Sequence, residues 1–303
     1  MITRWHSIAW ALALGGLLLV GCGRPSSPGS ADKLNITVSI VPQKYFVERI
    51  AGERVVVNVM VLPGNNPATY EPKPEQLTAL SEAVAYFSIG VPFEEVWLDK
   101  IAAANDRMMM VDTAAGIRRV PVDGHYKVEL GGLPESDAEG RDPHIWLSPS
   151  LVKIQAQNIY RALAELDPAR KTEYEVNLNR FIEDIDDLIT DVRETLADVP
   201  NRKFIVFHPA WGYFGDDFEL EMIPIEVGGQ EPSAAELADL ITVAREEGIK
   251  VIFAQPEFST QKAEVIAREI GGEVVLINPL AEDWLGNMRL VADTFARVLS
   301  ESG

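Results

Sequence analysis

Cysteine is nearly absent from this sequence. The chain of 303 residues contains one, Cys22, so no intramolecular disulfide can form. Its stability must come from a hydrophobic core, and 47% of the residues are hydrophobic. This length and composition allow two medium domains or one large one.

Positive charge is also scarce. There are 27 Lys and Arg against 46 Asp and Glu, which gives a formal net charge of −19 and a pI of about 4.6. Nucleic-acid binding needs a basic face, so we expect no nucleic-acid partner. An acidic surface attracts cations, but it is also a common way to keep a protein in solution. Charge alone therefore does not identify a ligand.

Long apolar runs are missing as well. The run IAWALALGGLLLV (8–20) is shorter than the roughly 20 residues of a membrane span. It follows Arg4 and ends in LVGC at Cys22, which resembles the lipobox of bacterial lipoproteins. The alternative is an ordinary secretory signal with a chance Cys.

The N-terminal pattern predicts a lipoprotein signal peptide (1–22), lipidation of Cys22 and a flexible Gly/Ser/Pro-rich tether (23–34). The signal peptide carries Arg4 and no acid, so the mature chain has a charge of about −20. We expect an extracytoplasmic protein, lipid-anchored to a bacterial membrane in the periplasm or at the cell surface.

Short β-branched runs alternate with helical patterns in two stretches. The predicted strands are 35–41, 54–62, 84–90 and 107–112 in the first, and 203–207, 220–227, 250–254 and 273–277 in the second. This alternation predicts an α/β fold of two similar (βα)-type lobes with mostly parallel sheets.

A long helical stretch separates the two series. Its one break is at Asp167-Pro168, and a helix of about thirty residues after the break would span roughly 45 Å. We interpret it as a rigid connector. The predicted domains are an N-terminal lobe (35–167), a connector (168–200) and a C-terminal lobe (201–303).

Unusual polar residues follow several predicted strands. After the signal peptide the chain has three histidines, and His144 and His208 lie in loops of different lobes. Ligands of open α/β sheets bind at the carboxyl ends of strands, so a cleft between the lobes would bring these loops together. Imidazole is a common ligand of zinc-like ions. No Ser-His-Asp order, nucleotide loop or Cys-His pair is present, so we expect no enzyme.

Several motifs in order carry a family resemblance. The segments YEPKP, DPHIWLSP, FHPAWGYF, GGQEPSAAELADLI and NPLAEDWLGNM resemble the metal-binding substrate-binding lipoproteins of zinc and manganese ABC transporters. The resemblance runs from about residue 35 to the C-terminus. It implies two lobes bridged by a rigid helix, a metal ion held between them, an ABC permease as partner, a monomer, and little closing motion.

The ligand set that this resemblance implies is incomplete here. His144 and His208 match two family ligands. Ala68 stands where the family has a His, in the loop NPATYEPKP, and Asn278 stands where it has an acid, which makes Asn278 a weak ligand. Glu257 is a possible compensating ligand.

Other acids could also compensate. These candidates are Asp283, Glu129, Glu135, Asp137 and Glu139, with His125 in the same segment as the last four. We interpret that segment (112–142) as a solvated acidic loop rather than a metal collector. Of the remaining cleft and loop residues, we expect Tyr70 and Glu71 to hold their loop, and Trp146 and Trp211 to wall the cleft or pack beneath it.

The sequence therefore favours capture of a divalent metal, zinc first, with manganese or no metal as alternatives. Two other functions stay open: binding of a metal chelate or a small non-metal ligand in the same cleft, and a surface adhesin or sensor.

Overall fold

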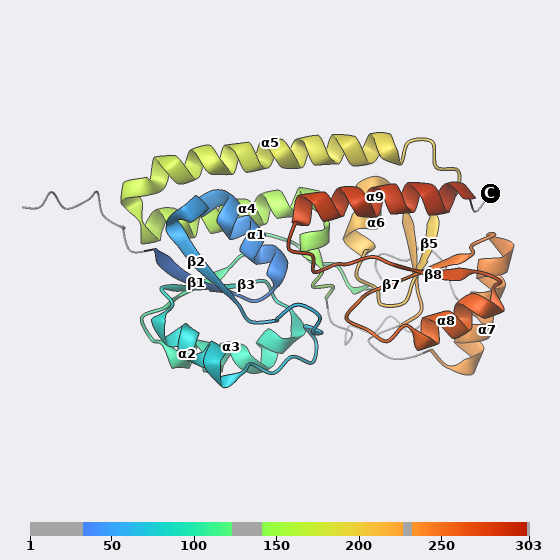
Figure 1. The fold of residues 1–303 in the computed structure, drawn as a ribbon, viewed down its shortest axis with the longest axis horizontal. Coiled ribbons are helices and arrows are strands. Elements are labelled where there is room, and N and C mark those ends of the chain that lie inside the picture. The colour runs from blue at the N-terminus through green and yellow to red at the C-terminus, as the bar shows by residue number, and fades with distance from the viewer. Residues whose placement is uncertain (1–32, 123–140, 227–231, 302–303) are drawn as a thin grey trace, which may run out of the picture. The chain divides into compact units, whose positions relative to one another are not determined.

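The computed structural model describes residues 33–122, 141–226 and 232–301 (Figure 1). The predicted signal peptide, Cys22 and nearly all of the tether lie outside these residues. So do His125, Glu129, Glu135, Asp137 and Glu139. Within the described ranges, no helix combines the length and the apolar character that crossing a membrane requires.

The N-terminal lobe is built on a four-stranded parallel sheet in the order β2-β1-β3-β4. Its strands are β1 (Leu34–Val38), β2 (Val55–Val59), β3 (Ala85–Ser88) and β4 (Met109–Asp112), and its helices are α1 (Val41–Ala51), α2 (Pro74–Glu82) and α3 (Pro92–Ala104). Every residue of β3 is buried, as expected for a parallel sheet covered on both faces.

The C-terminal lobe repeats this layout in the order β6-β5-β7-β8, again all parallel. Its strands are β5 (Lys203–Val206), β6 (Glu221–Pro224), β7 (Val251–Ala254) and β8 (Glu273–Leu276), and its helices are α6 (Gly212–Phe218), α7 (Ala234–Glu246), α8 (Gln261–Glu269) and α9 (Trp284–Glu301). The predicted α/β class with two similar parallel lobes is confirmed.

Two long helices in succession follow the N-terminal sheet, and the second of them lies in the predicted connector (168–200). The first is α4 (Pro149–Leu166), and a 3-10 turn at Pro168–Arg170 separates it from α5 (Lys171–Thr195). In Figure 1, α5 runs along both lobes with α9 beneath it. The 25 residues of α5 span about 37 Å, less than predicted, because the chain leaves the helix at Leu196.

A reciprocal pair of tryptophans joins the two lobes. Nε1 of Trp146, in the N-terminal lobe, donates to the Pro279 carbonyl at 2.8 Å, and Nε1 of Trp284 donates back to the Trp146 carbonyl at 2.8 Å. Both indoles are buried. Tyr213 of α6 adds a second bridge, because its hydroxyl donates to the Asp142 carbonyl and accepts from Val120 N. These bonds across the lobes oppose a wide opening.

We expect Trp284→Phe to lower the free energy of unfolding by about 1–3 kcal/mol, because the buried Trp146 carbonyl loses its donor. Urea denaturation measures this change. Trp97→Phe is the matched control, since Trp97 is only partly buried and its Nε1 makes no hydrogen bond to described residues. Equal losses in the two variants would contradict the bridging role of Trp284.

A buried carboxylate supports the loop after β3. Glu94, in the first turn of α3, accepts hydrogen bonds from Ile89 N at 3.0 Å and Gly90 N at 2.7 Å, and also bonds Ser39. Burial raises the pKa of Glu94, opposed by these hydrogen bonds and by the charge of Arg119. Glu94 thus fixes a loop that reaches the space between the lobes.

We expect Glu94→Gln to lower the free energy of unfolding by about 1.5–3 kcal/mol, because an NH2 donor replaces one of the two carboxylate oxygens that accept these hydrogen bonds. Since folding raises the Glu94 pKa above 4.5, the folded state binds more protons just above pH 4.5. The Glu94 contribution to stability is therefore full below pH 4.5 and falls as pH rises through the raised pKa.

The free energy of unfolding of the natural protein should therefore exceed that of Glu94→Gln by less and less as pH rises from 4.5. Urea denaturation across this range would test this. Glu95→Gln, on the exposed side of the same helix, is the control. A pH-independent difference would show that Glu94 does not titrate as described.

Candidate metal centre

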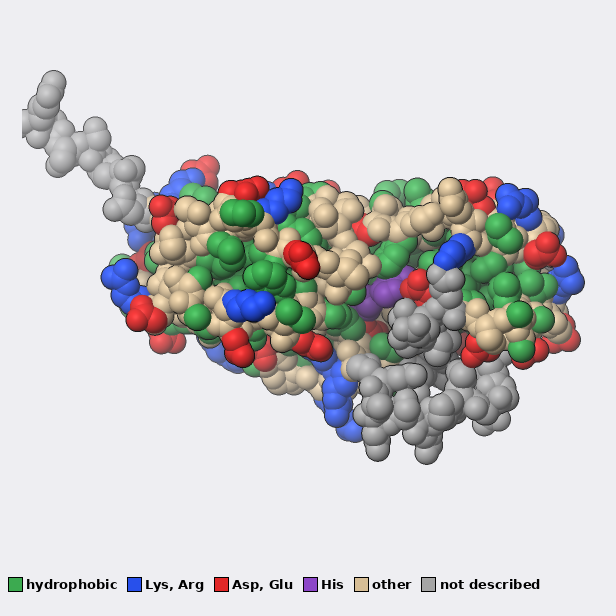
Figure 2. Space-filling model, turned by 90° about the horizontal axis from the view of Figure 1, so that it is seen from below, with side chains coloured by type: hydrophobic (Ala, Val, Ile, Leu, Met, Phe, Trp, Pro, Cys, Tyr) green, Lys and Arg blue, Asp and Glu red, His purple; other side chains and the backbone are tan. Residues whose placement is uncertain are grey.

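A cavity of about 590 Å³ lies between the lobes. Loops of both lobes form its wall: Asn66, Pro67, Ala68, Gly90, Val91, Pro92, Glu95, Arg119, Val122, Arg141, Pro143, His144 and Trp146 from the first, and His208, Pro209, Gln255, Glu257, Phe258, Pro279 and Leu280 from the second. Figure 2 shows histidine side chains recessed in the hollow of this face. The predicted meeting of loops from the two lobes is therefore observed, although His144 precedes the 3-10 turn Ile145–Leu147 rather than ending a strand.

His144 is held by the aspartate two residues before it. Asp142 is fully buried, and its Oδ1 accepts from His144 N at 2.8 Å and contacts His144 Nδ1 at 2.7 Å. Pro143 restricts the backbone between them. A carboxylate on Nδ1 selects the tautomer that carries its proton there, which leaves the Nε2 lone pair available for a metal ion.

His208 is held in the same way by a neighbouring strand. In the parallel pairing of β5 with β6, Val206 lies opposite Pro224, so the residues two positions further on, His208 and Glu226, come side by side. Glu226 Oε2 lies 2.9 Å from His208 Nδ1. The ring of Phe258 stacks on His208 with centroids 4.8 Å apart.

Burial lowers the pKa of His208, and the neighbouring His144 acts in the same direction, while Glu226 opposes them. His208 is therefore neutral at pH 7, the protonation state that binds metals.

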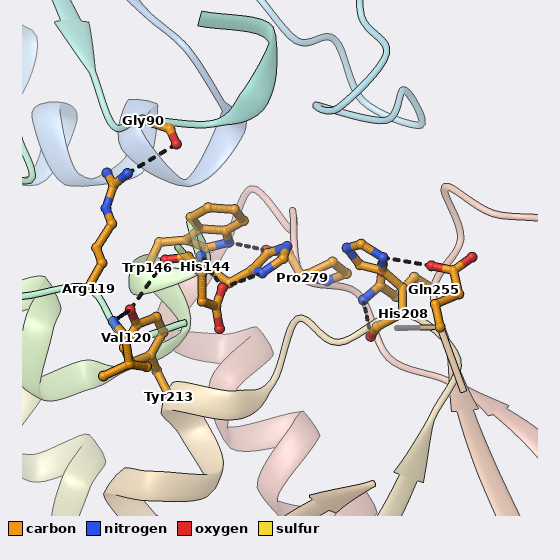
Figure 3. Close-up of polar contacts among 11 residues, drawn as sticks. Gly90, Arg119, Val120, His144, Trp146, His208, Tyr213, Gln255 and Pro279 are labelled. Carbon is orange, nitrogen blue, oxygen red and sulfur yellow. Dashed lines mark hydrogen bonds and ion pairs between the residues drawn. The ribbon is translucent and has the colours of Figure 1, made fainter. Parts of the chain in front are cut away.

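The two imidazoles have the separation of rings that share a metal ion. Their centroids are 5.3 Å apart with an interplanar angle of 79°. Zn–N bonds of about 2.0–2.1 Å place each ring centroid roughly 3.2 Å from the ion. A tetrahedral angle then separates two ligating rings by about 5.2 Å. In Figure 3 the two histidines face the same space from different lobes.

Glu257 and Ala68 also line this cavity. Oε2 of Glu257 is buried and has no hydrogen-bond partner among the residues that the structure describes, and burial raises the pKa of this carboxyl group. Ala68 is exposed on the opposite loop, and its N–H donates to Asn66 Oδ1 at 2.8 Å. In the described part of the chain, no three His, Cys, Asp or Glu side chains are grouped closely enough to hold an ion.

The predicted weak ligand Asn278 and the predicted compensating acid Asp283 are engaged elsewhere. Asn278 Oδ1 accepts from Leu280 N at 2.8 Å, and Asp283 Oδ1 accepts from Gly286 N at 3.1 Å in the first turn of α9. Neither residue contributes to the cavity wall. Each oxygen satisfies a backbone donor of its own turn, so it would have to leave that donor to reach a metal ion.

Of the remaining predicted cleft and loop residues, some line the cavity and others do not. Trp146 lines the cavity, with its ring 5.2 Å from that of His144. Trp211 does not line the cavity; it is fully buried against Phe214 and Phe295. Tyr70 is buried and donates to Gln76 at 2.7 Å, so it holds its loop, while Glu71 is exposed.

Sequence reasoning missed the two carboxylates that orient the histidines, and Arg119 and Arg141 in the cavity wall. The sequence could have identified Asp142 as a partner of His144, since it lies two residues before that histidine. It could also have suggested Glu226, because Glu226 follows β6 and His208 follows β5, and these two strands are neighbours. No local pattern identified the arginines.

Comparison with known proteins agrees with this geometry. A family profile described as "Zinc-uptake complex component A periplasmic" matches residues 36–298. The chain belongs to this family. That match covers both lobes and the connector, and it includes both histidines of the cavity.

The family has relatives of known sequence and structure. The high-affinity zinc uptake system protein ZnuA of Bacillus subtilis is 29% identical over 288 residues, covering 92% of this chain and 90% of that protein. A crystal structure of ZnuA is 48% identical with a TM-score of 0.81, covering 89% of this chain and all of that chain. A ZnuA deletion mutant with zinc bound has the same identity and TM-score, covering 99% of that chain.

Proposed function

We propose that this protein captures zinc between its lobes and delivers it to an ABC importer. The observation that carries the proposal is the histidine pair. His144 and His208 each have a carboxylate on Nδ1, and their rings are spaced as two ligands of one tetrahedral ion. Membership of the zinc-uptake family supports the same ligand. Here zinc is the cargo, with manganese as the second candidate.

Each histidine would contribute Nε2. Asp142 and Glu226 would fix the two rings and partly neutralise the charge of the ion. Glu257 is our candidate for a third donor, because its buried Oε2 has no partner within the described part of the chain and lies beside Phe258, which stacks on His208. Asn278 would be at most a weak donor, since its oxygen is already bonded.

The setting of this activity is part of the proposal. The protein would be anchored through lipidated Cys22, act outside the cytoplasm as a monomer, and hand its ion to a partner permease. It would catalyse no reaction. The tryptophan pair supports a small change of shape on loading, which solution scattering with and without zinc would measure.

Zinc titration of the mature protein tests the proposal directly. At zinc concentrations a hundredfold above Kd, we expect about 2.7 kcal/mol of added stability and a clear rise in Tm. Glu226→Gln keeps the shape of its side chain but removes the charge facing His208 Nδ1, so zinc affinity should fall about 10- to 100-fold.

Glu219→Gln is a matched control, since it removes the same charge from an exposed residue at the C-terminal end of α6, outside the cavity wall. An unchanged Tm in zinc would refute zinc capture. Equal affinities of the two variants would refute the role of Glu226.

A further inference from the structure

The cavity is much larger than a single ion requires. Its volume is about 590 Å³, whereas one water molecule occupies roughly 30 Å³ of the liquid. Two histidines, with or without Glu257, leave one or two positions of a tetrahedral zinc ion without a protein ligand. The cavity thus has room for a molecule of several non-hydrogen atoms beside the metal.

Two arginines in the cavity wall are unexpected for a site that takes a bare cation. Arg119 donates to the carbonyls of Ile89 and Gly90, and Arg141 donates to the Arg119 carbonyl at 2.9 Å. Figure 3 shows Arg119 extended toward Gly90. Gly90 has φ of +81°, and a Cβ there would meet the Arg119 guanidinium at 2.2 Å, so glycine at this position lets the side chain pack.

Neither arginine forms an ion pair with a described carboxylate. Nε and Nη2 of Arg141 make no hydrogen bond to described residues. Such a pair of N–H groups binds a carboxylate in bidentate fashion. The same wall carries Glu95 and Glu257, so it combines acidic groups suited to a cation with Arg141, whose N–H groups suit an anion.

We infer that the cavity binds zinc together with a small polycarboxylate chelator. One carboxylate would fill the open coordination positions, and another would pair with Arg141, with Arg119 adding positive charge. This inference rests on the proposed zinc site and specifies the form in which the ion arrives. Ala68 fits it, because a methyl group leaves room where a histidine would fill the wall.

The test compares zinc chloride alone, citrate alone, and both together, with the free zinc concentration held equal by a zinc buffer. We expect citrate to tighten zinc binding at least tenfold at equal free zinc, measured by calorimetry, with no binding of citrate alone. Arg141→Gln should lose this gain. Arg118→Gln, a neighbouring exposed arginine outside the cavity wall, should keep it.

Several results would overturn the inference. If zinc bound no more tightly with citrate than without it at equal free zinc, citrate would only compete with the protein for zinc. A gain that persisted in Arg141→Gln would remove the arginine from the site, and citrate binding without zinc would indicate a plain anion site. The absence of any zinc response, with or without citrate, would instead refute the proposed function itself.

Discussion

We expect Ala68→His to raise the affinity for zinc by roughly two to three orders of magnitude. A four-ligand zinc site provides about 10–16 kcal/mol, so one ligand provides roughly 2.5–4 kcal/mol, and each 1.4 kcal/mol is tenfold in Kd. Ala68 lies in the wall of the cavity that holds His144 and His208, so an imidazole there can reach the same space. Competition with a zinc-binding dye measures the change.

Thr69→His is the matched control. Thr69 is the next residue in the same exposed loop, but it does not line the cavity. A histidine there adds the same imidazole without adding a ligand to the site. If both variants gained equally, or neither gained, this loop would not face the proposed zinc position.

Loss of either cavity histidine should abolish zinc-dependent stabilisation. We expect His144→Gln and His208→Gln each to lower zinc affinity by roughly two to three orders of magnitude, because each removes one of two nitrogen ligands. The glutamine amide can still donate to Asp142 or Glu226, so those carboxylates need not lose their partner. Thermal melts with and without zinc provide the measurement.

His125→Gln is the control for these variants, since it removes the third histidine of the mature chain, outside the described residues. Urea denaturation without zinc checks that each variant still folds. Zinc-dependent stabilisation that survived in a His144→Gln, His208→Gln double variant would place the zinc site elsewhere.

The connector shows which features sequence periodicity can predict and which it cannot. The apolar residues of α5 recur at helical spacing, and the buried ones include Tyr174, Phe181 and Leu188, so the helix could be predicted from the pattern alone. Its end could not, because the first helix breaker in the sequence is Pro200, whereas the helix already ends at Leu196, with Leu196 and Val199 buried in the core. The same holds for Asn278 and Asp283, whose local backbone partners the sequence did not reveal.

The sequence by itself determined the α/β class, the two lobes, and the two loops, one from each lobe, that carry His144 and His208. Periodicity and breakers report which residues are buried and where an element ends, and both are local properties. Only the tertiary structure decided which side chains meet. The register of β5 with β6 paired His208 with Glu226, and the packing of the lobes put Arg119, Arg141 and Glu257 around the same cavity. Such contacts join segments far apart in the chain, so no local pattern encodes them.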